Sequence, residues 1–562
     1  MFVGTAWAPL SPQAFTAETP QKACGSFSAS RAGGRAGCSP RGEKSNSDGR
    51  KLPQSSLILQ QLLDLGRTPS EYEVFEIVSV GIGSWQENPR RATVVLSSLA
   101  TNKLPRTATY VLFAMLANSV EVNVFHCNAA MNACEKGRQW QLALSLLNGM
   151  PEMGVVPDRI SFSAAISACE KGGRWQMALG LLSSMPDMQV IPDKINYSAA
   201  ISACEKGGQW QLALGLLSSM PNMRLVPDRI SFNAAISACE KGGQWELALS
   251  LMSSMPDERV MANEISYNAA ISACAKGGQW QLALSLLSSL PDIGVAPNEI
   301  TYNAAISACE KGGYWQLALS LLSSMLDMRV IPNEISCSVV ISACEKGGQW
   351  QLALGLLSSM PVMRLIPDEI SHNAAISACE KGGQWQLALG LLSSMPGMRV
   401  IPDEISHNAA ISACEKGGQW QLALGLLSSM PDMRVIPNEI SYGAAISACE
   451  KGKRWQLALM LLRQMPQLQL SPGVPCFKAV ILSCVTCNRW QCTFNLLHDM
   501  LRLGVGPGVF TFATLLTESE QRGLLSTEHD LFLCLPGIPL EKPSECTEVL
   551  LGLLCNLTAV KI

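Results

Sequence analysis

Apolar residues recur along most of the chain with a fixed period of 35 residues. Within residues 159–193, RISFSAAISACEKGGRWQMALGLLSSMPDMQVIPD, two stripes follow the i, i+3, i+4, i+7 spacing of amphipathic helices. The first stripe is Phe162, Ala165, Ile166 and Cys169, and the second is Trp175, Ala178, Leu179 and Leu182. Gly172-Gly173 ends the first helix, and Pro192 cannot continue the second. The pattern therefore predicts one helical hairpin per unit.

Eleven units share this register, from residue 124 to residue 508. Cysteine recurs every 35 residues from Cys134 to Cys484, and tryptophan does so from Trp140 to Trp490. A fixed period of this size predicts a solenoid, in which each unit buries its apolar face against its neighbours. No strand pattern interrupts the array, so the predicted fold class is all-α. The last two units, 439–473 and 474–508, depart most from the pattern, as expected where repeats face water.

The segments on either side of the array have a different composition. Residues 1–51 are rich in Ser, Ala, Gly and Arg, with no acidic residue before Glu18. This is typical of a transit peptide of chloroplast type, and an ordinary disordered tail is the alternative. Residues 52–123 are expected to contain a helix, a connector and a degenerate repeat at 89–123. Residues 509–562 are expected to form a partial repeat and a helical capping tail.

Charge and cysteine content narrow the choice of partner and compartment. The formal net charge is −3, so any polyanion must be met by a local column of basic residues. Of the 21 cysteines, eleven occupy one repeated position. Equivalent sites in stacked hairpins lie on the order of 10 Å apart, whereas a disulfide needs Cα atoms within about 7 Å. We therefore expect buried, reduced cysteines.

The sequence offers no set of catalytic residues. The five histidines are scattered: His126, His372, His407, His498 and His529. Neither a phosphate-binding glycine loop nor an HExxH motif occurs. Cys484, Cys487 and Cys492, with Cys476 nearby, are close enough in sequence to suggest a metal site, but Cys484 occupies the repeated core position. We expect no cofactor, no metal, no small-molecule substrate and no membrane span.

A 35-residue helical hairpin ending in Pro-Asp or Pro-Asn resembles the pentatricopeptide repeat family. The matching phrase PDRISFNAAISACEKGGQWELALSLMSSM recurs with few changes across 385 residues. Tetratricopeptide repeats are less similar, because they carry tryptophan early in the first helix, whereas here it opens the second. The constant unit length is similar to the P-type arrays of the family. The resemblance implies a right-handed superhelix that binds single-stranded RNA, one base per repeat.

In this family the fifth and thirty-fifth residues of each repeat read the base, when Pro-Asp or Pro-Asn ends the repeat. Carried onto this chain, the fifth residues are Asn128, Ser163, Ser198, Asn233, Asn268, Asn303, Ser338, Asn373 and Asn408. The thirty-fifth residues are Asp158, Asp193, Asp228, Asn263, Asn298, Asn333, Asp368, Asp403 and Asn438. Exchanging Asp for Asn adds a donor to an acceptor group, which suits discrimination between bases. Drift among recent copies is the alternative explanation for this variation. Position 5 is expected on the helix face opposite the core stripe.

Two further columns follow from the resemblance. The second residue is expected to wedge beside the base: Phe125, Ile160, Ile195, Ile230, Ile265, Ile300, Ile335, Ile370, Ile405 and Ile440. Packing between repeats is the alternative for these side chains. The thirteenth residue is expected to contact phosphate: Lys136, Lys171, Lys206, Lys241, Lys276, Lys311, Lys346, Lys381, Lys416 and Lys451. A solvated Glu-Lys pair at the end of the helix is the alternative here.

The pairing rule of the family then implies a target sequence. Ser with Asp favours G, Asn with Asp favours U, and Asn with Asn favours C while tolerating U. The nine regular repeats read 5′-U-G-G-C-C-C-G-U-C-3′. Repeats with Gly443/Gly473 and Lys478/Gly508 fall outside the rule and are expected to contribute little.

Together these features predict a sequence-specific RNA-binding protein that is not itself an enzyme. The resemblance implies a role in the processing, stability or translation of an organelle transcript, with protein partners in RNA processing. The expected compartment is the chloroplast, with the mitochondrion as the alternative. A protein-interaction scaffold is the rival function, but a peptide groove should not restrict positions 5 and 35 to Ser/Asn and Asp/Asn.

Overall fold

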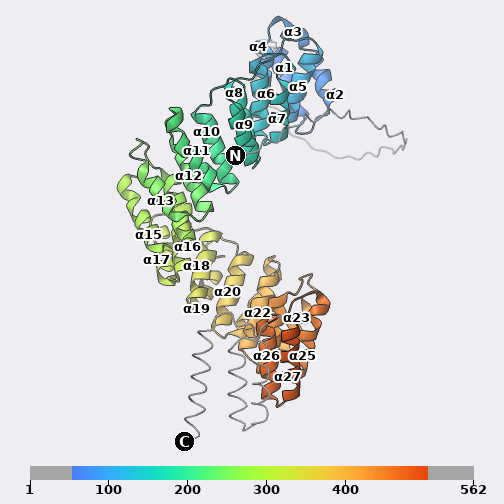
Figure 1. Ribbon diagram of the computed structural model, residues 1–562, viewed down its shortest axis with the longest axis vertical. Helices are drawn as coiled ribbons and strands as arrows, with labels where there is room; N and C mark the ends of the chain where they lie inside the picture. The colour runs from blue at the N-terminus through green and yellow to red at the C-terminus, as the bar shows by residue number, and fades with distance from the viewer. Residues whose placement is uncertain (1–53, 504, 506–562) are drawn as a thin grey trace, which may run out of the picture. The chain divides into compact units, whose positions relative to one another are not determined.

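The computed structural model describes residues 54–503 and 505. These residues belong to one compact unit that begins at Gln54. Every regular element among them is helical, and successive helices follow one another along the array in chain order (Figure 1). The predicted all-α, right-handed solenoid of helical hairpins is confirmed. The segments 1–51 and 509–562, including the expected transit peptide and capping tail, lie outside the described residues.

Eleven helix pairs make up the repeats. The first helices are α6 (Val124–Lys136), α8 (Arg159–Lys171), α10 (Lys194–Lys206), α12 (Arg229–Lys241), α14 (Glu264–Lys276), α16 (Glu299–Gly312), α18 (Glu334–Lys346), α20 (Glu369–Lys381), α22 (Glu404–Lys416), α24 (Glu439–Lys451) and α26 (Val474–Thr486). The second helices are α7 (Trp140–Gly149), α9 (Trp175–Ser184), α11 (Trp210–Ser219), α13 (Trp245–Ser254), α15 (Trp280–Ser289), α17 (Trp315–Asp327), α19 (Trp350–Ser359), α21 (Trp385–Ser394), α23 (Trp420–Ser429), α25 (Trp455–Gln464) and α27 (Trp490–Arg502). Short 3₁₀ turns follow four of the second helices: η1 (Pro221–Met223), η2 (Pro291–Ile293), η3 (Pro396–Met398) and η4 (Pro466–Leu468).

Five helices precede the first regular repeat: α1 (Gln54–Asp64), α2 (Glu71–Ser79), α3 (Ile82–Glu87), α4 (Arg90–Thr101) and α5 (Pro105–Ala117). The helices α4 and α5 form the hairpin expected of the degenerate repeat, and α4 packs against α6 as one first helix packs against the next. The connector expected before it is instead largely helical. Its helix α2 starts with a capping box, in which Ser70 and Glu73 bond each other's backbone N–H groups. None of the described helices is long and apolar enough to cross a membrane.

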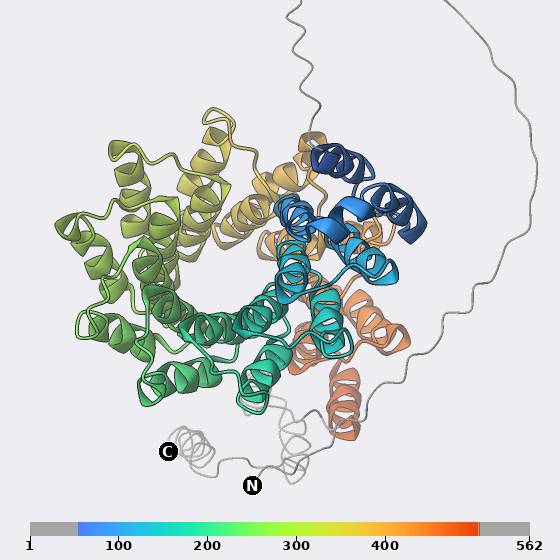
Figure 2. The same ribbon diagram turned by 90° about the horizontal axis from the view of Figure 1, so that it is seen from above.

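Two layers of helices form the array. Each first helix packs against the first helix of the next repeat, and each second helix packs against the first helices of its own and the following repeat. Figure 2 shows this succession from above. The close approach of first helices depends on small residues: in α8, Ala165, Ala168 and Cys169 are fully buried. The core therefore continues from repeat to repeat, and it is made of the residues of the predicted stripes.

A Schellman motif ends the first helices. In α8 the N–H of Gly173 donates to the carbonyl oxygen of Glu170, and the N–H of Arg174 donates to that of Cys169. Gly173 adopts a left-handed conformation with φ +67°, which glycine tolerates because it has no Cβ. This is the turn that the sequence predicts at Gly172-Gly173.

Candidate RNA interface

Position 35 of each regular repeat is the N-cap of the next first helix. The Oδ1 of Asp158 accepts the backbone N–H of Ser161 at 2.8 Å, and the Ser161 hydroxyl accepts the backbone N–H of Asp158 at 3.2 Å. Asn298 and Asn438 cap α16 and α24 in the same way. Asp and Asn are among the best N-cap residues, so the restriction of this position to those two residues has a structural cause. Capping does not explain why the chain alternates between them, since both cap equally well.

The structure brings positions 5 and 35 of each repeat together. The Asn128 amide donates to Asp158 Oδ1 at 3.1 Å, and the equivalent bond from Asn303 to Asn333 is 3.2 Å. Eight of the nine regular repeats have such a bond; the other six pairs are Ser198–Asp228, Asn233–Asn263, Asn268–Asn298, Ser338–Asp368, Asn373–Asp403 and Asn408–Asn438. In the remaining repeat, Ser163 instead accepts from Asn196 at 2.9 Å. The two residues that the sequence pairs through the family rule are therefore neighbours in space.

Position 5 is less exposed than the sequence analysis expected. Ser198, Ser338, Asn373 and Asn408 are each less than a tenth exposed, and the others are half-buried. The prediction that this position lies opposite the core was wrong in part, because the stacked first helix of the next repeat covers it. Position 3 of that helix supplies the covering group: the Ser161 hydroxyl donates to Asn128 Oδ1 at 2.6 Å. The serine that occupies position 3 in most repeats was the signal that sequence reasoning missed.

Hydrogen bonds stabilise the ionised form of two position-35 carboxylates, Asp158 and Asp403. Burial raises the pKa of Asp158, but the hydrogen bonds from Ser161 and Asn128 outweigh it and bring the pKa below its usual value. The pKa of Asp403 is lowered in the same way, by Ser406 and Asn373. In these two repeats the aspartate therefore carries a negative charge at neutral pH that an asparagine would not carry.

The position-2 side chains form a column of exposed apolar groups. Each position-2 isoleucine, from Ile160 to Ile440, is between 55% and 64% exposed, and Phe125 is 69% exposed. Packing between repeats, the alternative considered for these residues, does not account for so much exposed apolar surface. Each side chain belongs to the first turn of the helix that position 35 of the preceding repeat caps. The column thus offers one apolar surface per repeat beside the polar pairs.

The position-13 lysines are mostly held in ion pairs. Lys171 Nζ lies 2.6 Å from Glu135 Oε1 of the preceding repeat, and seven further lysines pair in the same way at 2.5–3.0 Å: Lys206, Lys241, Lys276, Lys346, Lys381, Lys416 and Lys451. The Glu-Lys pairing considered from the sequence therefore exists, but between repeats and not within one. The expected basic column is an alternating ladder of glutamate and lysine.

Lys136 and Lys311 are the two exceptions in this ladder. The residue that would pair with Lys311 is Ala275, and the one that would pair with Lys136 is Ala100. Among the described residues no ion pair involves either lysine, and both are exposed. These two positive charges are the least neutralised of the column.

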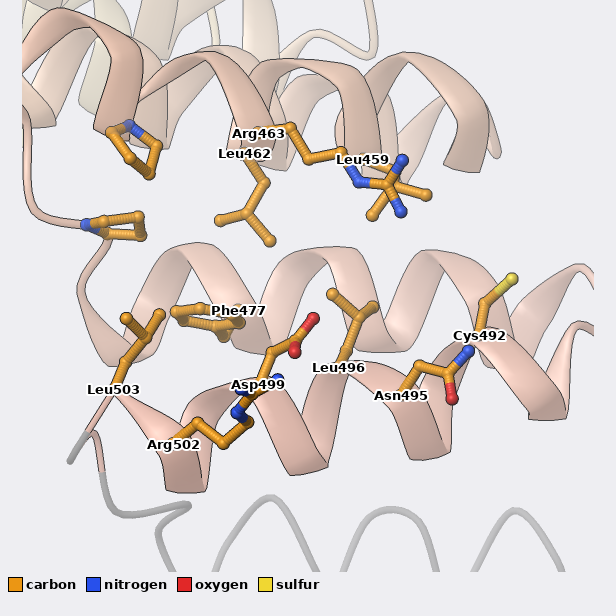
Figure 3. Close-up of a pocket in the computed structure, with 12 residues that line it drawn as sticks. Leu459, Leu462, Arg463, Phe477, Cys492, Asn495, Leu496, Asp499, Arg502 and Leu503 are labelled. Carbon is orange, nitrogen blue, oxygen red and sulfur yellow. The ribbon is translucent and has the colours of Figure 1, made fainter.

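One pocket lies away from these columns. It has a volume of about 530 Å³ and is lined by Leu459, Leu462, Phe477 and Leu496 of α25, α26 and α27, together with the charged Arg463, Asp499 and Arg502 (Figure 3). None of the residues predicted to bind RNA lines it. It therefore does not bear on the candidate interface.

Comparison with known families agrees with this geometry. A profile described as "PPR repeat family" matches residues 227–276, 262–311 and 297–346, and one described as "Pentatricopeptide repeat domain" matches 111–172 and 180–242. The profile "PPR repeat" matches 160–190, 335–365, 370–400, 405–435 and 440–470. Together these matches span more than half of the chain. A comparison with curated protein sequences gave no match.

Solved structures give the same fold. The crystal structure of the pentatricopeptide repeat protein PPR10 in complex with an 18-nt psaJ RNA element is similar with a TM-score of 0.54 and 16% identity, covering 85% of this chain and 86% of that one. The crystal structure of PPR10 from maize has a TM-score of 0.47 at 16% identity, covering 88% and 95%. At this identity the likeness concerns the fold alone.

Proposed function

The chain belongs to the pentatricopeptide repeat family, and from this premise we propose that it binds single-stranded RNA, one base per repeat. One observation carries the proposal: in eight of nine regular repeats, the position-5 and position-35 side chains are hydrogen-bonded to each other, within a surface that carries an exposed apolar side chain per repeat. A repeated polar pair beside an apolar surface suits a base, which needs edge contacts and a stacking partner.

Each part of the interface has a separate role in this proposal. The position-5 and position-35 side chains contact the edge of the base, and the position-2 side chain packs against its face. The lysines of position 13 contact the phosphates, which requires each paired lysine to share its charge with the glutamate of the preceding repeat. Lys136 and Lys311 need no such exchange. The target follows the order U-G-G-C-C-C-G-U-C, with U tolerated at each C.

The proposed mode of action is occupation of the RNA without catalysis. A bound array shields its segment from nucleases, prevents it from pairing, or places a partner enzyme beside it. We place this activity in the chloroplast, with the mitochondrion as the alternative, on the composition of residues 1–51. A transport assay with the intact and the truncated chain, using isolated organelles of both kinds, tests that location.

Selection of random single-stranded RNA by the full-length protein tests the function. We expect enrichment of a motif close to UGGCCCGUC, at a controlled salt concentration because phosphate contacts are sensitive to salt. Binding of RNA without any enriched motif would contradict the base-reading roles, but it would remain consistent with contacts between the lysines and the phosphates. Absence of RNA binding would instead favour a protein scaffold.

Exchanging one pair of residues tests the base-reading role directly. Asn303→Ser with Asn333→Asp should change the preferred base at the sixth position from C to G, because the new pair copies Ser338 and Asp368 of the next repeat. The N-cap is preserved, since Asp caps as well as Asn. The reciprocal variant, Ser338→Asn with Asp368→Asn, should change the seventh base from G to C. Altered affinity with unaltered base preference in both variants would refute the assignment.

A further inference from the structure

The two ends of a position-35 side chain have different partners. The Oδ1 of Asn298 accepts hydrogen bonds from the backbone N–H of Thr301 at 2.9 Å and from the Thr301 hydroxyl at 2.8 Å. It also accepts one from the side-chain amide of Asn268 at 3.5 Å. In Asp193, Oδ1 likewise accepts two backbone N–H groups of α10, from Ile195 and Asn196. Capping therefore uses the atom that Asp and Asn have in common. The atom in which they differ, Oδ2 or Nδ2, faces elsewhere.

That second atom meets position 1 of the same repeat. The Nδ2 of Asn298 donates to Glu264 Oε1, and the Nδ2 of Asn438 donates to Glu404 Oε1. In the repeat that ends in Asp193, the partner is instead Arg159, whose Nε lies 3.3 Å from Asp193 Oδ2. In these three repeats, position 1 presents an acceptor to the amide of Asn or a donor to the carboxylate of Asp. It therefore contacts the atom in which Asp and Asn differ.

We propose that position 1 is a third specificity-determining residue of the repeat, a positioning residue that acts on the base through position 35. The inference rests on the proposed RNA binding. Capping holds one atom of Asn298, and Glu264 holds one N–H of its amide, so the direction of the second N–H is set before RNA binds. An amide fixed in this way discriminates between bases better than one that rotates, because a wrong base cannot reorient it.

Not every repeat has the matched pair. Position 1 is basic in three repeats, at Arg159, Lys194 and Arg229, and acidic in the next six, at Glu264, Glu299, Glu334, Glu369, Glu404 and Glu439. Three repeats are mismatched: Arg229 accompanies Asn263, Glu334 accompanies Asp368, and Glu369 accompanies Asp403. No hydrogen bond or ion pair joins any of these couples within the described residues. Two carboxylates repel each other, so the last two of these repeats should hold position 35 less firmly.

The chain provides a matched control. Glu439 occupies position 1 of a repeat whose thirty-fifth residue is Gly473, which has no side chain to orient, and its carboxylate accepts from Ser471 instead. Glu264→Met and Glu439→Met each remove one negative charge and one hydrogen-bond acceptor next to the same surface. Both should therefore raise affinity for every RNA alike, but only the first should change base preference.

The experiment measures Kd for four nine-base RNAs that differ only at the fifth position, the base assigned to Asn268 and Asn298. In Glu264→Met the ratio of Kd values between the rejected and preferred bases should fall about threefold to tenfold, the effect of one hydrogen bond. In Glu439→Met the ratio should not change. Glu369→Arg copies the Arg159–Asp193 pair, so we expect this variant to discriminate more strongly between bases at the eighth position.

The outcomes separate this inference from the function on which it rests. Wild-type protein that discriminates at the fifth base, with an unchanged ratio in Glu264→Met, overturns the role of position 1 alone. Equal changes in Glu264→Met and Glu439→Met also overturn it, because they would reflect the lost charge and not the orientation of position 35. Wild-type protein that binds no RNA overturns both. Thermal unfolding of each variant checks that the ratio, and not the fold, has changed.

Discussion

At the scale of single residues, the two glycines that end most of the first helices are required for different reasons. The second, such as Gly383, has φ +69° and would be strained by any side chain. The first, Gly382, has an ordinary conformation, but a Cβ there would lie 2.3 Å from Cδ1 of Trp350 in the preceding repeat. The regular spacing of tryptophan and glycine therefore reflects one contact between repeats, which recurs from Trp140–Gly172 to Trp420–Gly452.

After the second helix, most repeats have a residue other than glycine at the position that adopts a left-handed conformation. Arg364 has φ +62°, whereas Gly154 and Gly294 occupy the equivalent position in two other repeats. Arg364→Gly should raise the free energy of unfolding by about 1 kcal/mol, because it removes a left-handed arginine. Gly383→Ala, with the same backbone geometry, should lower it by a similar amount. Urea unfolding followed by circular dichroism measures both, and destabilisation by Arg364→Gly would contradict the argument.

The repeated cysteines are buried thiols with no disulfide partner; all sixteen cysteines in the described part of the chain are free. Burial raises the pKa of Cys239 to about 11, and those of Cys134 and Cys484 to about 12. Because the folded pKa lies above the unfolded value, the folded state keeps these thiols protonated while the unfolded state ionises. The stabilisation that the buried thiols contribute is therefore fully present below pH 9, and it declines as the pH rises from about 9 to about 11.

The burial of the repeated cysteines also predicts how fast each thiol reacts with an alkylating reagent. At pH 8 the core thiols should resist alkylation in the native protein, because they are both protonated and inaccessible. Cys487 and Cys492 are partly exposed and should react first. Peptide mapping after brief treatment with iodoacetamide distinguishes the two groups. Rapid modification of Cys239 without unfolding would show that the burial is wrong.

At the scale of the helix, the residue at position 4 decides whether a first helix buries a polar side-chain atom that has no hydrogen bond. Most repeats have an aromatic residue there, such as Tyr267, whose hydroxyl lies near Ser289. His372 and His407 are fully buried, and their Nδ1 atoms contact the backbone oxygens of Asp368 and Asp403. Within the described part of the chain, neither Nε2 atom has a hydrogen-bond partner. A buried polar atom without a hydrogen bond destabilises the helix that carries it.

We expect His372→Tyr to stabilise the protein by about 1 kcal/mol, since it removes the unsatisfied nitrogen. The tyrosine already fits the equivalent site of other repeats, and Ser394 is in the register of Ser289. The reverse change, Tyr302→His, should cost a similar amount. Calorimetric melting temperatures of the two variants provide the measurement. A lower melting temperature for His372→Tyr would show that the imidazole nitrogen is satisfied in solution.

At the scale of the whole array, the Glu-Lys ladder balances most of the charge that a basic column would otherwise present. Glu135 to Lys171 is one of eight such pairs, and the gap at Ala275 leaves Lys311 uncompensated near the middle of the array. Position 1 also changes from basic to acidic between Arg229 and Glu264. Under the proposed function, the electrostatic attraction for RNA would therefore be concentrated at particular repeats and not spread evenly.

Filling the gap in the ladder tests this view. Ala275→Glu should pair with Lys311 and weaken RNA binding at low salt, with a salt dependence reduced by about 0.7 in the slope of log Kd against log salt. Ala275→Gln is the control and should leave both quantities unchanged. Filter binding across a range of salt concentrations measures the slopes. Equal effects of the two variants would mean that Lys311 does not contact phosphate.

The sequence by itself determined the period, the helical hairpins, the all-α solenoid and the buried cysteines. It could do so because these features depend on residues close together in the chain: the stripe from Phe162 to Cys169, the turn at Gly172-Gly173 and the break at Pro192. Repetition then placed the same pattern at every junction, so a correct reading of one unit described the others.

Only the tertiary structure decided which polar groups meet. The contacts from Asn128 to Asp158, from Lys171 to Glu135 and from Asn298 to Glu264 join residues 30–36 positions apart, and each crosses a junction between helices. Periodicity shows that such contacts repeat, but not which positions they join, because that depends on the offset and rotation of one stacked hairpin on the next. For the same reason, the exposure of Ile160 and the burial of Ser198 could not be derived from their helical spacing.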